Sequence, residues 1–216
     1  LKVFSNGNQI HQSSLGISEI NNSTEQLRIG GWYQTYTPTH KTFNGSIDDV
    51  RIYDRALSAA EVAALYQMES TPIPSAGLQL WLDGKDFDGD GNATNDPTAG
   101  AKLPDWTDKS VNERNATQST TADQPVVIAG GGLSFDGVHD HLTLGDRYIF
   151  STNDGMTLIA VAETNASISK SNGLYSFGLL GDKVFSLRFN SGNVSSVSSL
   201  NHGGKDSGYN VTASGR

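Results

Sequence analysis

The sequence predicts an all-β protein, in which many short antiparallel strands are joined by tight turns and accompanied by one short helix. The chain contains 24 glycines and many serine, threonine and asparagine residues, which favour turns. Its apolar residues fall in short runs that alternate with polar residues, as in half-buried strands. Only one segment has the spacing of an amphipathic helix. The apolar content of 36% is sufficient for a packed core.

The first elements are predicted strands. Leu1–Phe4 and Gln9–His11 flank Asn6-Gly7, and Asn-Gly is a strong hairpin signal because both residues tolerate positive φ. Leu27–Trp32 is a second short strand that contains two glycines. The polar and aromatic segment Tyr33–Thr42 predicts a loop.

A longer strand is predicted over Ile47–Tyr53. Val50 and Ile52 share one face of this strand, and Arg51 lies on the other face. The alternation of apolar and polar residues slips at Asp48-Asp49. We therefore expect a β-bulge at this pair.

A helix is predicted from Ser58 to about Gln67, because Ser58 and Glu61 have the spacing of a capping box. Val62, Leu65 and Tyr66 form its apolar stripe. Glu69–Ser75 contains two prolines and predicts a linker.

The chain returns to strands at Leu78–Leu82, and an Asp/Gly/Asn loop follows over Asp83–Gly100. Met156–Ala162 is the most apolar segment and predicts the central core strand, whereas the Ser/Gly/Asn-rich chain from Asn190 onward predicts poorer order. Trp81 and Trp106 have apolar neighbours and are predicted in the core. Further strands are expected at residues 124–128, 133–135, 141–144, 156–163, 173–180 and 184–189.

Two stretches resemble a known family. Phe43–Val62 contains F-N-G-S-I-D-D-V-R-I-Y followed by R-A-L-S, and it resembles the closing motif of laminin-G-like domains of the concanavalin A-like lectin/glucanase superfamily. Leu78–Asp83, Trp106–Thr117 and Ser134–Asp140 resemble the opening of another such domain. The resemblance implies a two-sheet antiparallel jelly-roll sandwich.

The order of these stretches is reversed, since a domain ending precedes a domain beginning. In one interpretation, residues 1–68 are the C-terminal part of one module, 69–75 a linker and 76–216 the N-terminal part of the next module. In the other, the two pieces close on each other as one permuted sandwich. We favour the second, because separate half-cores would leave much apolar surface exposed. It predicts Ile47–Tyr53 beside Leu78–Leu82.

The clearest candidate site is the segment from Asp86 to Asp96, where alternate carboxylates and a glycine after the third resemble the first half of a calcium loop. The predicted calcium ligands are Asp86, Asp88, Asp90, Asn92 (through its carbonyl) and Asp96. The twelfth position is Pro97 rather than the glutamate of an EF-hand. The alternative is a solvated, turn-rich loop.

Other candidates carry less specific signals. Asp48 and Asp49 are a second possible metal pair, for which we favour bonds to the backbone or to a nearby arginine. Asp136 and Asp140 are predicted turn formers. Trp32, Tyr33 and Tyr36 form an aromatic cluster that predicts either a glycan platform or a cap on the open end of the core.

Composition and motifs argue against several classes of function for this chain. The net charge of −8 disfavours nucleic acid as a partner, no apolar run is long enough to cross a membrane, and the absence of cysteine is typical of a bacterial exported protein. Related folds include glycosidases, but their E-x-D-x-x-E pattern of catalytic carboxylates is absent. We therefore expect a non-catalytic, extracellular or cell-surface module for recognition or adhesion that binds a glycan or a protein. The alternatives are a spacer beside neighbouring modules of a longer chain, or an accessory module of a polysaccharide-degrading enzyme.

Overall fold

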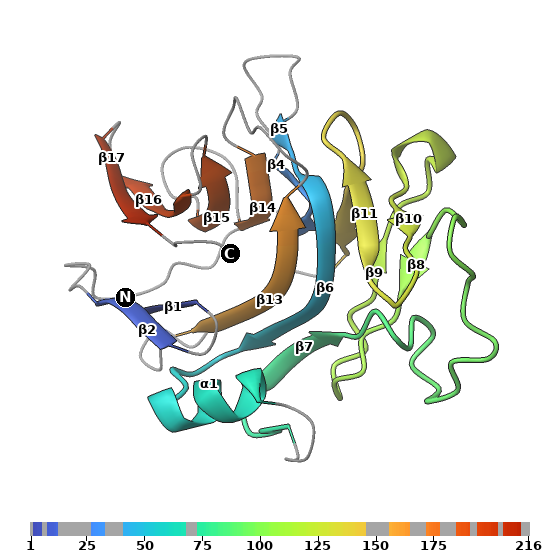
Figure 1. Cartoon of the computed structure of the whole chain (residues 1–216), viewed down its shortest axis with the longest axis horizontal. Coiled ribbons are helices and arrows are strands. Elements are labelled where there is room, and N and C mark those ends of the chain that lie inside the picture. Colours follow the sequence, from blue (N-terminus) through green and yellow to red (C-terminus); the bar gives the residue numbers. More distant parts are fainter. Residues whose placement is uncertain are drawn as a thin grey trace.

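The structure is a computed structural model, which describes residues 2–5, 8–12, 27–32, 41–67, 73–145, 156–164, 172–177, 185–190, 194–202 and 205–212. The described residues form antiparallel sheets, one α-helix and one short 3-10 helix, η1 (Thr121–Asp123). This arrangement confirms the predicted all-β, jelly-roll class of fold (Figure 1). No described helix has the length and apolarity that a membrane crossing requires.

Two larger sheets enclose the core. The five-stranded sheet contains, in order, β10 (Val126–Val127), β11 (Leu133–Asp136), β6 (Asn44–Tyr53) and β13 (Thr157–Thr164), with β7 (Leu78–Leu82) also paired to β6. The eight-stranded sheet contains, in order, β17 (Lys205–Thr212), β16 (Val194–His202), β15 (Phe185–Asn190), β14 (Asn172–Phe177), β3 (Arg28–Ile29), β12 (Leu142–Leu144), β9 (Ala116–Thr117) and β8 (Asp105–Trp106). Two small hairpins are formed by β1 (Lys2–Ser5) with β2 (Asn8–Gln12) and by β4 (Gly31–Trp32) with β5 (Lys41–Thr42).

Strand β6 is the centre of the five-stranded sheet and curves beside β13 over its length (Figure 1). One edge of β6 pairs with β13. Its other edge is shared, because its first residues pair with β11 and its last residues pair with β7. The division falls at Asp48-Asp49, where the register to β13 shifts and Asp49 has a φ of 53°. The predicted bulge is therefore present.

The two parts of the chain on either side of residues 69–75 share one hydrophobic core. Val50 pairs with Leu82, and Ile52 with Leu80, so the predicted placement of Ile47–Tyr53 beside Leu78–Leu82 is confirmed. Ile47 and Ile52 lie in the same buried cluster as Trp106. The cluster joins residues of both larger sheets, which places the core between them.

Helix α1 (Ala59–Tyr66) begins after Ser58, as predicted, and covers the outer face of the five-stranded sheet. The Ser58 side chain accepts a hydrogen bond from the Glu61 amide, and Glu61 binds back to the Ser58 amide, which completes the capping box. Hydrogen bonds from Arg55 and Ser58 lower the pKa of Glu61 to about 2. Val62 and Leu65 of the predicted stripe pack around Tyr53 under the helix, whereas Tyr66 is 60% exposed and lies outside this cluster.

Two fold predictions need correction. Met156–Ala162 contributes to β13, which lies at the end of the five-stranded sheet as far as the structure describes it, so the central strand is β6. The segment after Asn190 contributes strands β16 and β17, which pair with each other. Trp106 is fully buried as predicted, but Trp81 lies outside the core cluster. Leu80 and Leu82 occupy the core-facing positions of β7, and strand alternation turns Trp81 to the outer face.

A candidate cation site in the loop after strand β7

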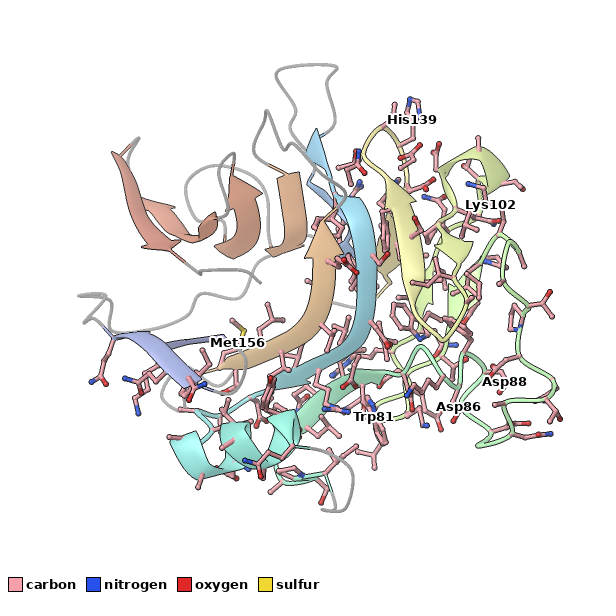
Figure 2. The ribbon with its side chains drawn as sticks, in the orientation of Figure 1. Trp81, Asp86, Asp88, Lys102, His139 and Met156 are labelled. Carbon is pink, nitrogen blue, oxygen red and sulfur yellow. The ribbon has the colours of Figure 1, made fainter. Side chains whose placement is uncertain are left out.

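The candidate site lies in the acidic loop, defined here as residues 83–100, which leaves the end of β7 (Figure 2). Phe87 fixes this loop to the core, where its ring packs 5.8 Å from the ring of Trp106. The Thr107 amide also donates a 2.9 Å hydrogen bond to the Phe87 carbonyl. Phe87 is 3% exposed. Its burial holds the flanking residues Asp86 and Asp88 at the edge of the core.

A series of local turns shapes the exposed part of the loop. The Asp88 carboxylate accepts from the Asp90 amide, the Asp90 carboxylate from the Asn92 amide, and the Asn92 side chain from the Thr94 amide. Each is a side chain bonded to the amide two residues later, which is the local preference of Asp and Asn. The alternate spacing of polar residues in the sequence therefore sets the backbone path.

Asp86 is the buried member of the group, with 5% of the residue exposed. Its Oδ2 atom accepts hydrogen bonds from the Lys109 ammonium at 2.5 Å and from the Gly91 amide at 3.1 Å. Its Oδ1 atom is buried and accepts no hydrogen bond from any described residue. Leaving a charged oxygen buried without a partner is costly, so Oδ1 is the position at which an additional cation would stabilise the loop.

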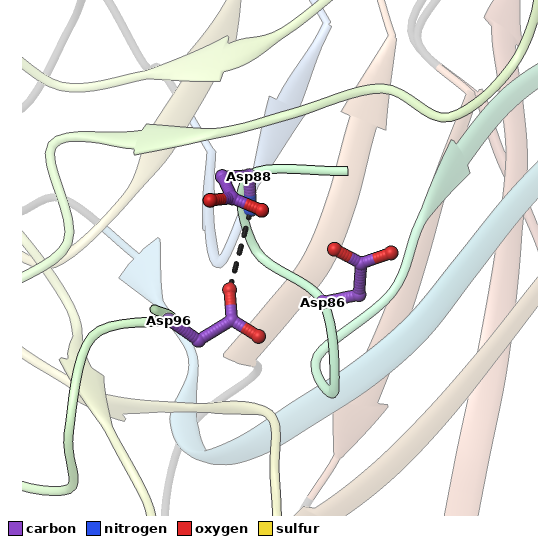
Figure 3. Close-up of side chains that lie close together, drawn as sticks. All are labelled: Asp86, Asp88 and Asp96. Carbon is purple, nitrogen blue, oxygen red and sulfur yellow. Dashed lines mark hydrogen bonds between the residues drawn. The ribbon is translucent and has the colours of Figure 1, made fainter. Parts of the chain in front are cut away.

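Asp96 returns the loop toward Asp86. Its Oδ1 atom accepts from the Phe87 amide at 2.8 Å and from the Asp88 amide at 3.4 Å, and the second of these bonds is drawn in Figure 3. Its Oδ2 atom is buried, and no described group donates to it. One ligand oxygen from each of Asp86, Asp88 and Asp96 lies within 4.8 Å of the others.

Asp90 and Asn92 are not brought into this group by their side chains. The Asp90 Oδ2 atom accepts from the Asn95 side chain at 2.8 Å, and the Asn92 carbonyl accepts from the Asn95 amide. Both residues are exposed. Of the five predicted ligands, the structure therefore gathers Asp86, Asp88 and Asp96.

The carboxylates of Asp86 and Asp88 differ in how well their negative charges are compensated by nearby groups. Burial by itself would raise the pKa of Asp86, but hydrogen bonds from Lys109 and from the Gly91 amide hold that pKa below its ordinary value. The Asp90 amide lowers the pKa of Asp88, yet desolvation and the negative charges of Asp90 and Asp96 outweigh it, so the pKa of Asp88 is raised. A divalent cation would relieve this repulsion.

The donor set suits calcium. It consists of oxygen atoms from three carboxylates, and calcium prefers several such hard oxygen ligands in a flexible arrangement. Two of these three residues, Asp86 and Asp96, each have a buried oxygen without a donor among the described residues. Asp86, Asp88 and Asp96 would hold the ion, and the ion would supply the positive charge that these oxygens lack.

Lys109 is a residue beside this candidate site that the sequence analysis missed. Its ammonium lies 2.5 Å from Asp86 Oδ2 and 3.0 Å from Asp83 Oδ2. It also lies 4.6 Å from the centre of the Trp81 ring. Burial lowers the pKa of Lys109, but the two carboxylates outweigh burial and raise it. Only the chain folding back brings residue 109 to the loop, so local spacing gave no signal for it.

The remaining acidic candidates have local partners. Asp48 accepts from its neighbour's amide and from the Gly84 amide, and Asp49 forms a 2.5 Å ion pair with Arg51. These are the bonds to the backbone and to a nearby arginine that the sequence predicts. A side chain on Gly84 would meet the Asp48 carboxylate and the Gly132 backbone, so only glycine fits where β7 and β11 separate. Asp136 accepts three amide hydrogen bonds and forms its turn as predicted.

The aromatic cluster stays a prediction. Trp32 lies in β4, while Tyr33 and Tyr36 fall outside the described residues, as does the Trp32 side chain.

Comparison with known proteins supports the family resemblance. The sequence model of the concanavalin A-like lectin/glucanases superfamily matches residues 1–63. The matched residues include the closing motif, Phe43–Val62, which resembles that superfamily. No curated protein and no solved structure matches the chain.

Proposed function

We propose that this chain is a non-catalytic, extracellular recognition module whose acidic loop is stabilised by one calcium ion. The family match indicates a ligand-binding module of the laminin-G-like or concanavalin A-like kind. The observation that carries the calcium proposal is the buried Asp86 carboxylate, whose Oδ1 atom has no donor among the described residues. Asp88 and Asp96 complete the oxygen group around it.

The calcium ion has a structural role in this proposal. Phe87 connects the loop to the core through Trp106, so an ion that fixes the loop also stabilises the packed state. With a dissociation constant of about 0.1 mM, which is within the range of extracellular modules, 5 mM calcium would add about 2 kcal/mol to the free energy of unfolding. Magnesium would add less, because it gives up its own water shell reluctantly.

Titration calorimetry and thermal unfolding test this proposal. Wild-type protein is expected to release or absorb heat with calcium and to unfold at a higher temperature in 5 mM calcium than in EDTA. Asp86→Asn should lose both responses, since it removes the buried charge while retaining the shape. Asp123→Asn, which changes a carboxylate outside the loop, should keep both. A wild-type protein that shows neither heat nor stabilisation at millimolar calcium would contradict the proposal.

The recognised ligand is proposed to be a glycan or an extracellular protein. The support is the superfamily match and the sequence cluster Trp32, Tyr33 and Tyr36, because aromatic faces stack on sugar rings. Glycan-array binding that disappears in Trp32→Ala and Tyr36→Ala would support a glycan. Unchanged binding in both variants would remove the cluster from the proposed site.

A further inference from the structure

The acidic loop is already in contact with a positively charged side chain of the protein, that of Lys109. The Lys109 ammonium contacts Asp86 Oδ2 at 2.5 Å and Asp83 Oδ2 at 3.0 Å, and its side chain is only 18% exposed. An ordinary surface lysine is strongly hydrated and mobile. Lys109 is instead held between two carboxylates and beside the ring of Trp81.

The backbone fixes Lys109 in this place. Its amide donates a 2.8 Å hydrogen bond to the Trp81 carbonyl, on the edge of β7 opposite β6. The preceding residue, Asp108, accepts from the Trp81 amide at 2.9 Å and from the Ser110 amide. The segment around Lys109 therefore lies along β7, and the position of its charge follows from this attachment.

The two carboxylate oxygens of Asp86 differ in their hydrogen-bond partners, and Lys109 contributes to this difference. Oδ2 is engaged by Lys109 and by the Gly91 amide, whereas Oδ1 has no donor among the described groups. A metal would thus find one free oxygen on Asp86. The three carboxylates of the site carry a formal charge of −3, and the Lys109 ammonium reduces this charge to −2. Calcium affinity depends on the number of charged ligands, so this lysine weakens the attraction.

We propose that Lys109 is an affinity-determining residue of the calcium site, which keeps binding weak and holds the loop folded when calcium is absent. This inference rests on the proposed calcium function. The effects of orientation and charge can be separated here, because the Gly91 amide binds Asp86 Oδ2 as well and is expected to hold the carboxylate when the lysine is replaced. A residue with only a structural role would weaken calcium binding when replaced. Lys109, as a competing positive charge, should strengthen binding when replaced.

The test compares calcium affinity by calorimetry in wild type, Lys109→Met and Lys109→Arg. Lys109→Met keeps most of the aliphatic stem and removes the charge, so we expect its dissociation constant to fall on the order of tenfold. Without calcium it should unfold at a lower temperature than wild type, and calcium should raise its unfolding temperature by more. Lys109→Arg retains the charge and should bind within about threefold of wild type.

Lys85→Met is the matched control, because Lys85 lies in the same loop, is exposed and forms no ion pair among the described residues. Its calcium affinity should stay within about twofold of wild type. Lys109→Gln, which keeps a donor for Asp86, serves as a second charge-removing variant. Equal or weaker binding by both Lys109→Met and Lys109→Gln would overturn the inference, and so would failure of both to fold in saturating calcium. Absence of calcium binding by wild type would instead overturn the proposed function.

Discussion

Two acidic segments of this molecule look alike in sequence and differ in structure. In the turn at residues 136–140, Asp136 Oδ1 accepts hydrogen bonds from the amides of Val138, His139 and Asp140. The carboxylate of Asp140 accepts from the Asp136 amide and faces Lys102. In the loop after β7, by contrast, buried oxygens of Asp86 and Asp96 have no donor among the described residues.

The comparison shows that a count of aspartates does not identify a cation site. Both segments contain Asp-Gly steps and a buried aspartate. Backbone amides and Lys102 together satisfy the carboxylates of the turn, whereas the loop supplies too few donors for its buried oxygens. Because a buried charge needs a partner, the loop and not the turn is the segment that an external cation would stabilise.

The largest expected effect concerns the anchor of the loop. Phe87→Ala removes a ring that packs against Trp106 and should lower the free energy of unfolding by about 3–5 kcal/mol. It should also abolish calcium binding, since Asp86 and Asp88 lose their fixed positions. Val138→Ala is the matched change in the turn, where the side chain is 54% exposed, and should alter stability by less than about 0.5 kcal/mol. Chemical denaturation and calorimetry measure both. Normal calcium binding by Phe87→Ala would contradict the claim that Phe87 holds the carboxylates of the loop in place.

A smaller effect is expected in the turn itself. Asp136→Ala leaves three amides without their acceptor and should cost about 1–3 kcal/mol of unfolding free energy. The cost should be the same in calcium and in EDTA, as judged by urea unfolding. Asp136→Asn retains an acceptor oxygen and should cost less. A cost that depended on calcium would show that the turn, too, is linked to a cation.

The smallest expected effect concerns the turn at residues 136–140, where the pKa values of Asp136 and Asp140 are shifted in opposite directions. Burial would raise the pKa of Asp136, but its three amide donors outweigh burial and hold it below the ordinary value of 3.8. Its contribution to stability is therefore complete above pH 3.8 and is lost as the pH falls through the lower, folded-state pKa. Burial and the charge of Asp136 raise the pKa of Asp140 above 3.8, although Lys102 opposes this. Asp140 has the opposite effect on stability. Because its pKa is raised in the folded state, lowering the pH through that pKa protonates Asp140 and favours the folded state.

NMR titration of the carboxyl carbons should place Asp136 below Asp140, with the same order in calcium and in EDTA. In Asp136→Ala, the pKa of Asp140 should move down, because one of the charges that raises it is gone. Asp136 titrating above Asp140 would contradict the hydrogen-bond pattern of the turn.

The sequence by itself determined the local features of this protein. The capping box at Ser58 and Glu61, the bulge at Asp48-Asp49 and the alternation of β6 depend on neighbours within a few residues, and short-range patterns report such contacts. The closing motif similarly predicted the superfamily and hence the pairing of β6 with β7. The acidic spacing predicted the loop and the three aspartates that the structure gathers.

Only the tertiary structure decided which charges have partners. Lys109 reaches Asp86 from 23 positions away, and whether Asp86 Oδ1 receives a donor depends on the whole packing around it. Likewise, Trp81 faces outward because Leu80 and Leu82 fill the core positions. Burial and long-range charge pairing arise when distant segments pack together, so no local pattern encodes them.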